Sequence, residues 1–212
     1  MKRLIDILLA VAAMLLLSPL IVTLAALLRI QLGSPVLFRQ IRIGKANQPF
    51  NLCKFRTMHY ATDPHGNPLE DSLRTPRLGQ FLRRYSLDEL PELWNILRGE
   101  MSFVGPRPLL PEYLPYYSAA EASRHEVRPG LTGLAQVSGR SHLSWDEQLQ
   151  LDIQYVDSAS LLLDFRIILQ TVFQLVYPKN SETPDGKQRI SLIEERRDRL
   201  PPEKPTLQQS EK

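Results

Sequence analysis

The sequence predicts an α+β fold, mostly helical, in which an N-terminal membrane helix carries a small globular domain. Three observations predict this organisation: an apolar run near the N-terminus, strand-like stretches followed by helical patterns, and a polar C-terminal segment. We therefore divide the chain into a membrane helix with its flanks (residues 1–34), a globular domain (35–177) and a flexible polar tail (178–212).

The composition excludes several classes of protein. With 43% hydrophobic and 23% charged residues, the chain of 212 residues is a folded protein. Its single cysteine, Cys53, excludes a disulfide framework and a four-cysteine zinc site, and no two of its four histidines have the i, i+4 spacing of a zinc-binding helix. The net charge of +3 is too small to indicate a partner. We expect any metal to be held by carboxylates and substrate phosphates.

The apolar run covers residues 7–28 and contains only Ser18, Pro19 and Thr23 outside the strongly apolar residues and alanine. As a helix it would be about 33 Å long, enough for a hydrocarbon core of about 30 Å. The run is too long for a signal peptide and lacks a clear cleavage site. One transmembrane span is therefore its simplest interpretation.

Two features of the run favour a different topology. Basic residues flank both of its ends, so the positive-inside tendency draws both ends to the cytoplasm. Pro19 lacks a backbone donor and kinks a helix near the middle of the run, where the Ser18 hydroxyl can bond a carbonyl left unpaired. A kinked hairpin that enters and leaves by one face satisfies both features. From the residues alone, the span and the hairpin both stay open.

The globular domain is expected to alternate short elements with loops. In chain order we expect strands within 35–58, a polar loop at 61–76, a helix over 78–98 broken near Tyr85, an irregular proline-dense segment at 105–115, and helices at 144–157 and 164–177. The last helix is apolar on most faces, so it is either buried or lies on a membrane surface.

Two adjacent carboxylates, Asp88 and Glu89, are the most informative candidates for chemistry. Either Ser86 and Glu89 form a capping box, or Asp88 is the cap and Pro91 falls in the first turn. In both cases the carboxylates lie at a helix N-terminus, whose partial positive charge keeps them ionised. Plain capping explains the pattern in isolation. The basic residues one turn upstream, Arg83 among them, favour a carboxylate that binds magnesium beside a phosphate or attacks the phosphate.

Three further motifs place cations on restrained backbone. Arg107 lies between two prolines, and its guanidinium suits bidentate phosphate binding. Residues 124–140 combine three glycines with basic residues, which lets backbone donors approach an anion. Lys54 and Arg56 alternate along one strand. A solvated surface residue explains each motif alone, but together with the carboxylates they indicate a phosphate-handling enzyme at a lipid surface.

The order of these motifs resembles that of the bacterial sugar transferases, the monotopic phosphoglycosyl transferases that initiate glycoconjugate assembly. The resemblance rests on the Ser-Pro pair of the apolar run, on KFRTM, on RRYSLDELPELWNILRGEMSFVGPRP and on RHEVRPGLTGLAQVSGR. It covers about residues 2–177 and is to the small form of the family. It implies a re-entrant membrane helix broken at Ser18-Pro19, and a cytosolic catalytic domain on the cytoplasmic face of the bacterial inner membrane.

The resemblance also implies a reaction. A sugar-1-phosphate passes from a UDP-sugar to polyprenyl (undecaprenyl) phosphate through a phospho-aspartyl intermediate, UMP is released, and Mg²⁺ is the cofactor. The implied partners are the UDP-sugar, polyprenyl phosphate, membrane lipids and downstream glycosyltransferases, and no nucleic acid is expected. The reaction is expected to start the assembly of a polysaccharide or another glycoconjugate.

The resemblance assigns roles to individual residues. Asp88 matches the nucleophile and the metal-associated position, and Glu89 matches its partner. Arg83 and Arg107 match basic positions near the substrate phosphates. Further substrate-binding candidates are Lys54, Arg56, His125, Arg128, Gln136 and Arg140. The expected structural residues are Ser18 and Pro19 at the helix break and Pro106 and Pro108 in the substrate loop.

Two alternatives remain beside this assignment. A non-catalytic module could bind anionic lipid headgroups with the same cations, but such a module has no use for the carboxylate pair. In the closer alternative, Asp88 acts as a base or metal ligand while the lipid phosphate attacks directly.

The tail shows no apolar periodicity and lies outside the resemblance, so we expect it to be dispensable for activity.

Overall fold

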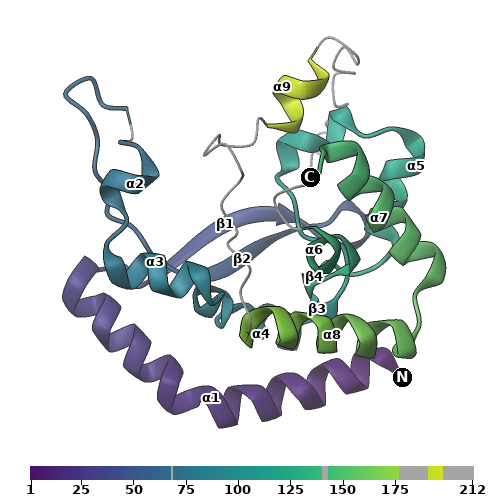
Figure 1. The fold of residues 1–212 in the computed structure, drawn as a ribbon, viewed down its shortest axis with the longest axis horizontal. Helices are drawn as coiled ribbons and strands as arrows, with labels where there is room; N and C mark the ends of the chain where they lie inside the picture. The colour runs from purple at the N-terminus through teal and green to yellow at the C-terminus, as the bar shows by residue number, and fades with distance from the viewer. Residues whose placement is uncertain (68, 140–142, 177–190, 198–212) are drawn as a thin grey trace, which may run out of the picture.

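Helix α1 (Lys2–Leu32) runs along one side of the molecule, and the rest of the chain lies on its concave side (Figure 1). The computed structural model describes residues 1–67, 69–139, 143–176 and 191–197. Within that part of the chain, α1 is the one helix long and apolar enough to cross a membrane. Most of its large apolar side chains are exposed, so the globular domain alone does not provide the apolar surroundings that this helix requires.

The Ser-Pro pair bends α1 without interrupting it. The helix is continuous from Lys2 to Leu32 with Pro19 inside it, and Figure 1 shows it as a bent rod. A residue with an N–H at position 19 would bond the carbonyl of Leu15. The Ser18 hydroxyl donates to that carbonyl instead, at 2.8 Å, as expected from the sequence. The predicted break is therefore a bend whose freed acceptor is satisfied.

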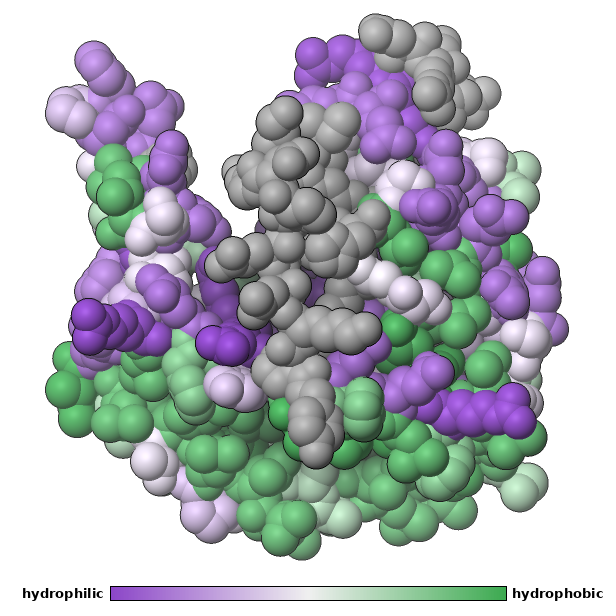
Figure 2. All heavy atoms as spheres, viewed as in Figure 1, coloured by the Kyte–Doolittle hydropathy of each residue, from purple (hydrophilic) through white to green (hydrophobic). Residues whose placement is uncertain are grey.

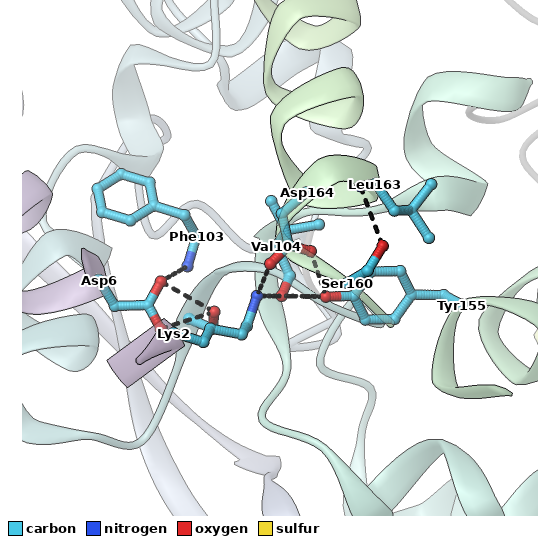
Figure 3. A network of polar contacts seen from close by, with 9 residues as sticks. Lys2, Asp6, Phe103, Val104, Tyr155, Ser160, Leu163 and Asp164 are labelled. Carbon is cyan, nitrogen blue, oxygen red and sulfur yellow. Dashed lines mark hydrogen bonds and ion pairs between the residues drawn. The ribbon is translucent and has the colours of Figure 1, made fainter. Parts of the chain in front are cut away.

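The N-terminal end of α1 is attached to the domain through a polar network (Figure 3). Lys2 forms an ion pair with Asp164 of helix α8 (Leu161–Val176), and its ammonium also donates to the Val104 carbonyl at 3.1 Å. One turn later, the Asp6 carboxylate accepts hydrogen bonds from the Ser102 hydroxyl and the Phe103 amide at 2.9 and 3.2 Å. This end of the helix is therefore held by charged contacts.

The C-terminal end of α1 is attached to the same domain. Leu24 and Leu28 are buried against Phe55 and Leu82. Arg56 donates to the carbonyls of Leu32, Gly33 and Ser34 at the helix end, where the backbone dipole favours a cation. Both ends of the apolar helix thus contact one globular domain.

Strands β1 (Leu37–Ile43) and β2 (Pro49–Phe55) are the strands expected in this region, and they form an antiparallel hairpin in which Leu37 pairs with Phe55 and Ile43 with Pro49. The 3₁₀ turn η1 (Lys45–Asn47) joins them. The inward side chains of β2, Phe50 and Leu52, pack with Ala10 of α1 and with two residues of a later helix, Leu93 and Ile96. Together these side chains form one of the hydrophobic cores. The hairpin therefore links the membrane helix to the helices that follow.

The helical segment predicted over 78–98 with a break near Tyr85 is confirmed. The short helix α2 (Asp71–Arg74) precedes it, and the segment itself consists of α3 (Arg77–Arg84), the 3₁₀ turn η2 (Leu87–Glu89) and α4 (Glu92–Arg98). Asp88 and Glu89 lie in η2, between the two longer pieces.

Two short strands, β3 (Ser102–Val104) and β4 (Gly130–Thr132), pair in parallel and were not expected from the sequence. Their ends bring the Gly-Pro-Arg-Pro loop against the Arg-Pro-Gly loop. A Cβ atom on Gly130 would lie 2.1 Å from the Gly105 nitrogen, so only a glycine fits this approach. The Gly130 amide donates to the Pro106 carbonyl at 3.0 Å. Two motifs that are separate in the sequence are therefore neighbours in space.

Further helices lie between and after these two strands in the chain. They are η3 (Pro111–Tyr116), α5 (Ala119–Ala122), η4 (Ser123–Glu126), α6 (Leu134–Ser138), α7 (Trp145–Ser158) and α8. Helices α7 and α8 confirm the two predicted in this region. The outward face of α8 exposes Phe165, Leu169 and Phe173, and Figure 2 shows a continuous apolar band along the α1 and α8 side of the molecule.

Seven residues of the expected flexible tail, 191–197, are described, and they are ordered against the domain. Residues 191–197 include helix α9 (Leu192–Arg196), which starts with a capping box between Ser191 and Glu194. Leu192 is fully buried and Arg196 is nearly so. A helix of five residues is too short to produce a detectable apolar period, which is why the sequence pattern did not indicate it.

Candidate active site

The two adjacent carboxylates lie on a strained turn rather than on a capped helix. Ser86 adopts a left-handed conformation (φ 53°, ψ 25°), which is costly for a residue with a side chain. Neither expected capping arrangement forms, because the Ser86 side chain makes no cap bond and Pro91 is the N-cap of α4. The turn is held by backbone bonds, including Glu89 N–H to the Ser86 carbonyl at 3.2 Å.

Glu89 lies between two cations that come from distant parts of the chain. Its Oε1 atom is 2.6 Å from Lys54 Nζ of β2 and 3.0 Å from Arg107 Nη2 of the proline-flanked loop. Burial alone would raise the pKa of this carboxyl, but the charges of Arg107 and Lys54 prevail and lower it to about 2. Glu89 is therefore ionised at all physiological pH values. The structure thus brings together Lys54, Glu89 and Arg107, three residues that the sequence analysis named as candidates.

Asp88 has a different environment from its neighbour. Among the described residues, no cation lies within 4 Å of its carboxylate, whereas Glu89 has two. Burial and the negative charge of Glu89 raise the pKa of Asp88, against the opposing effect of Lys54 and Arg83. Its carboxylate is consequently more basic than an ordinary aspartate and is not engaged by an ion pair, two properties that suit a nucleophile.

Glu92 is a third carboxylate of the site, and the sequence analysis did not single it out. Its side chain is 4% exposed, and its Oε1 atom lies 3.2 Å from Lys54 Nζ. Burial, followed by the charge of Glu89, raises the pKa of Glu92 to about 7. Its position three residues after Glu89 was a sequence signal that could have indicated a shared face.

Arg42 of β1 is the other residue that the sequence analysis did not assign to the site. Burial, and then the charge of Arg107, lower the pKa of its guanidinium, whose Nη2 donates to the Gln40 side-chain oxygen at 2.7 Å. The strand end is tied to the Arg107 loop by a hydrogen bond from Ile43 N–H to the Leu109 carbonyl, 3.1 Å.

Arg83 borders the site from α3. Its Nε donates to the Thr57 hydroxyl at 2.9 Å, and its Nη1 lies 3.3 Å from the Asp71 carboxylate. It contributes to the field at Asp88, whose pKa it helps to hold down. The arginine is thus oriented beside Asp88 by two neighbours without forming an ion pair with it.

The other predicted substrate-binding residues have contacts elsewhere. Arg56 binds the carbonyls at the end of α1, so it does not share the surroundings of Lys54. His125 is buried beside the Tyr117 ring, and burial and Arg124 lower its pKa to about 4, so it is neutral. Arg128 Nε donates to the Gly99 carbonyl and Gln136 Nε2 to the Leu131 carbonyl, at 2.8 and 3.3 Å. Arg140 lies outside the described residues.

The carboxylates fit a metal only in combination with a substrate. Within the described ranges, no three His, Cys, Asp or Glu side chains converge to hold a metal ion by themselves. Mg²⁺ is commonly bound by one or two carboxylates together with substrate phosphate oxygens. Asp88, a hard oxygen ligand without an ion-pair partner in the described chain, fits that mode of binding.

An apolar helix, together with a site that holds the ionised Glu89 between Lys54 and Arg107 beside a second carboxylate, is typical of an enzyme that acts on phosphate-bearing substrates. The chain belongs to the bacterial sugar transferase family, which it matches over residues 1–178. It is accordingly a transferase of phosphate-linked groups.

Several relatives cover most of the chain. It is 46% identical over 172 residues to an uncharacterised sugar transferase, EpsL, of Bacillus subtilis, covering 81% of this chain and 85% of that protein. It is 39% identical over 190 residues to a UDP-glucose:undecaprenyl-phosphate glucose-1-phosphate transferase of Caulobacter vibrioides, covering 85% of this chain and 71% of the relative. An Aeromonas hydrophila UDP-N-acetylgalactosamine-undecaprenyl-phosphate N-acetylgalactosaminephosphotransferase is 37% identical over 183 residues, which are 81% of this chain and 42% of that protein.

Proposed function

We propose that this protein transfers a sugar-1-phosphate from a UDP-sugar to undecaprenyl phosphate and releases UMP, as the first step of polysaccharide or other glycoconjugate assembly. The observation that carries the proposal is the arrangement of Glu89 between Lys54 and Arg107, next to an Asp88 carboxylate that has no ion pair with any described residue. The names of the Caulobacter and Aeromonas relatives support the substrate classes. A non-catalytic lipid-binding module accounts neither for the buried Glu89 and Glu92 nor for these relatives.

In the proposed first step, an Asp88 carboxylate oxygen attacks the sugar-bearing phosphorus of the UDP-sugar. The new bond joins Asp88 to that phosphorus, and the bond from the phosphorus to the bridging oxygen breaks, so that UMP leaves with the electron pair. Arg107 has guanidinium donors beyond the one that contacts Glu89, and its side chain is 43% exposed, so it can bind phosphate oxygens. The environment of Asp88, which raises its pKa, makes its carboxylate a better nucleophile.

In the second step, a phosphate oxygen of undecaprenyl phosphate attacks the same phosphorus and displaces the Asp88 carboxylate. The product is an undecaprenyl diphosphosugar, and the free enzyme is restored. Mg²⁺, held by Asp88 and substrate phosphates, would neutralise phosphate charge. The ion pairs of Glu89 with Lys54 and Arg107 hold those two cations in place throughout both steps.

We further propose that α1 is re-entrant and that the protein is monotopic on the cytoplasmic face of the inner membrane. Three observations support this topology: the bend at Pro19, the contacts of both helix ends with one domain, and the apolar band shared by α1 and α8 (Figure 2). A straight span would separate its two ends by about 30 Å of hydrocarbon. The lipid phosphate would then meet the site in the plane of the membrane, which shortens its search.

A direct test is release of UMP from a panel of UDP-sugars, in the presence of Mg²⁺ and undecaprenyl phosphate. We expect at least one UDP-sugar to give repeated turnover that depends on the lipid. If the folded, membrane-bound protein released no UMP from any sugar of the panel, the proposal would be refuted.

A further inference from the structure

The loop that carries Arg107 is held in place mainly by contacts with other parts of the chain. Pro106 and Pro108 have no N–H groups, so the loop lacks two of its backbone donors. Its carbonyls are held from outside: the Arg107 carbonyl accepts from Arg124 Nη2 at 2.7 Å, and the Leu109 carbonyl accepts from Ile43 N–H at 3.1 Å. The position of Arg107 therefore depends on what its neighbours pack against.

Leu109, two residues after Arg107, enters an apolar cluster that α9 completes. The cluster consists of Leu109, Tyr113, Trp145, Leu149 and Leu192. Leu109 is 8% exposed and Leu192 is 0% exposed. Loss of Leu192 would leave a cavity or a wet gap in the cluster that holds Leu109.

Arg196 anchors α9 to the segment that follows the Arg107 loop. Its Nη1 donates to the Tyr116 carbonyl of η3 at 2.8 Å, and both terminal nitrogens contact the Glu121 carboxylate at 2.7 Å. Its Nη2 also contacts the Asp146 carboxylate at the start of α7. A nearly buried guanidinium with this many partners has a defined geometry, so α9 is a docked element. Residues 191–197 lie beyond the family match, which ends at residue 178.

We propose that α9 is a positioning element for the reaction: Leu192 closes the cluster around Leu109, Arg196 fixes η3, and together they hold Arg107 against Glu89. The proposal rests on the proposed function only in that Arg107 binds the substrate phosphates. It reverses the expectation that the whole segment after residue 178 is dispensable. Leu192 and Arg196 act through Arg107, so both are positioning residues.

The first test compares turnover of Leu192→Ala in the wild-type and the Arg107→Ala backgrounds, with Arg197→Gln as an exposed control on the same turn of chain. We expect Leu192→Ala to lower UMP release on the order of tenfold in the wild-type background, because a small misplacement of a phosphate-binding group is costly. In the Arg107→Ala background we expect no further loss. Equal losses in the two backgrounds, or no loss in the wild type, would overturn the proposal.

The second test reads the position of the loop without substrate. We expect hydrogen exchange in the peptide spanning residues 105–113 to become faster in Leu192→Ala and in Arg196→Gln, and to be unchanged in Arg197→Gln. Arg196→Lys should restore slow exchange only in part, because lysine lacks the planar fork that contacts Glu121. Unchanged exchange in both Leu192→Ala and Arg196→Gln would overturn the proposal, whatever the substrate turns out to be. Faster exchange in a protein that releases no UMP would instead locate the failure in the proposed function.

Discussion

Replacement of Arg107 is the perturbation whose size follows most directly from the site. Its guanidinium donates to Glu89 at 3.0 Å, and in the proposed reaction it also contacts a phosphate. A charge-assisted hydrogen bond contributes about 1.5–3 kcal/mol, and every 1.4 kcal/mol corresponds to about tenfold in rate. We expect Arg107→Ala to lower the rate of UMP release by roughly tenfold to about 150-fold. Arg107→Lys should recover only part of this loss, because lysine cannot form the planar bidentate pair.

The same replacement should change the pH profile. After burial, Arg107 is the largest influence on the pKa of Glu89, which it lowers. Without that charge the pKa of Glu89 rises above about 2, so activity should be lost at a higher pH on the acid side than in the wild type. Arg98→Ala is a matched control, since that side chain is 59% exposed in an ion pair with Glu100. Wild-type turnover and an unshifted acid limb in Arg107→Ala would refute the reasoning.

Further perturbations test the carboxylate cluster and the membrane helix. The pKa of Glu92 is raised to about 7 from an ordinary value of 4.5, so between these pH values the folded protein keeps a proton that the unfolded chain loses, and stability falls as pH rises. We therefore expect the melting temperature of Glu92→Gln to fall less than that of the wild type between pH 4.5 and 7. Equal pH dependence in the two proteins would contradict the raised pKa of Glu92. For the topology, cysteines introduced at Met1 and at Gln40 should both resist a membrane-impermeant thiol reagent added outside intact cells, whereas labelling of the first alone would indicate a simple span. Pro19→Ala should weaken the bend and convert part of the population to that span.

The elements that the sequence indicated are those with a local cause. Strand-like stretches and turn residues predicted strands β1 and β2, helical patterns predicted α7 and α8, and the proline at position 19 predicted that the Ser18 hydroxyl would bond a backbone carbonyl. Strands β3 and β4 have three residues each, too few for an alternation signal, and they pair across 28 positions of chain between Ser102 and Gly130. Their pairing depends on tertiary contacts such as the close approach of Gly105 and Gly130.

The residues of the site also divide into those that the sequence indicated locally and those that depend on tertiary contacts. Lys54, Glu89 and Arg107 were recognisable as charged residues in restrained segments, and the structure joins them. Glu92 and Arg42 acquire their unusual environments from burial and from charges on other elements, which no local pattern reveals. Arg56 alternates with Lys54 in sequence, but β2 ends at Phe55, so the strand pattern no longer sets its direction and it turns to the end of α1.

The central claim, that Asp88 is the nucleophile, is tested most directly by mixing enzyme with UDP-sugar and Mg²⁺ without a lipid acceptor. The account predicts release of at most one UMP per active site, with the phosphosugar retained on the protein and located on Asp88 by mass spectrometry. Asp88→Asn keeps the shape of the side chain but removes most of its nucleophilicity, so it should give no UMP and no adduct. Absence of UMP until the lipid is added, or an Asp88→Asn enzyme that turns over at near wild-type rate, would contradict the account.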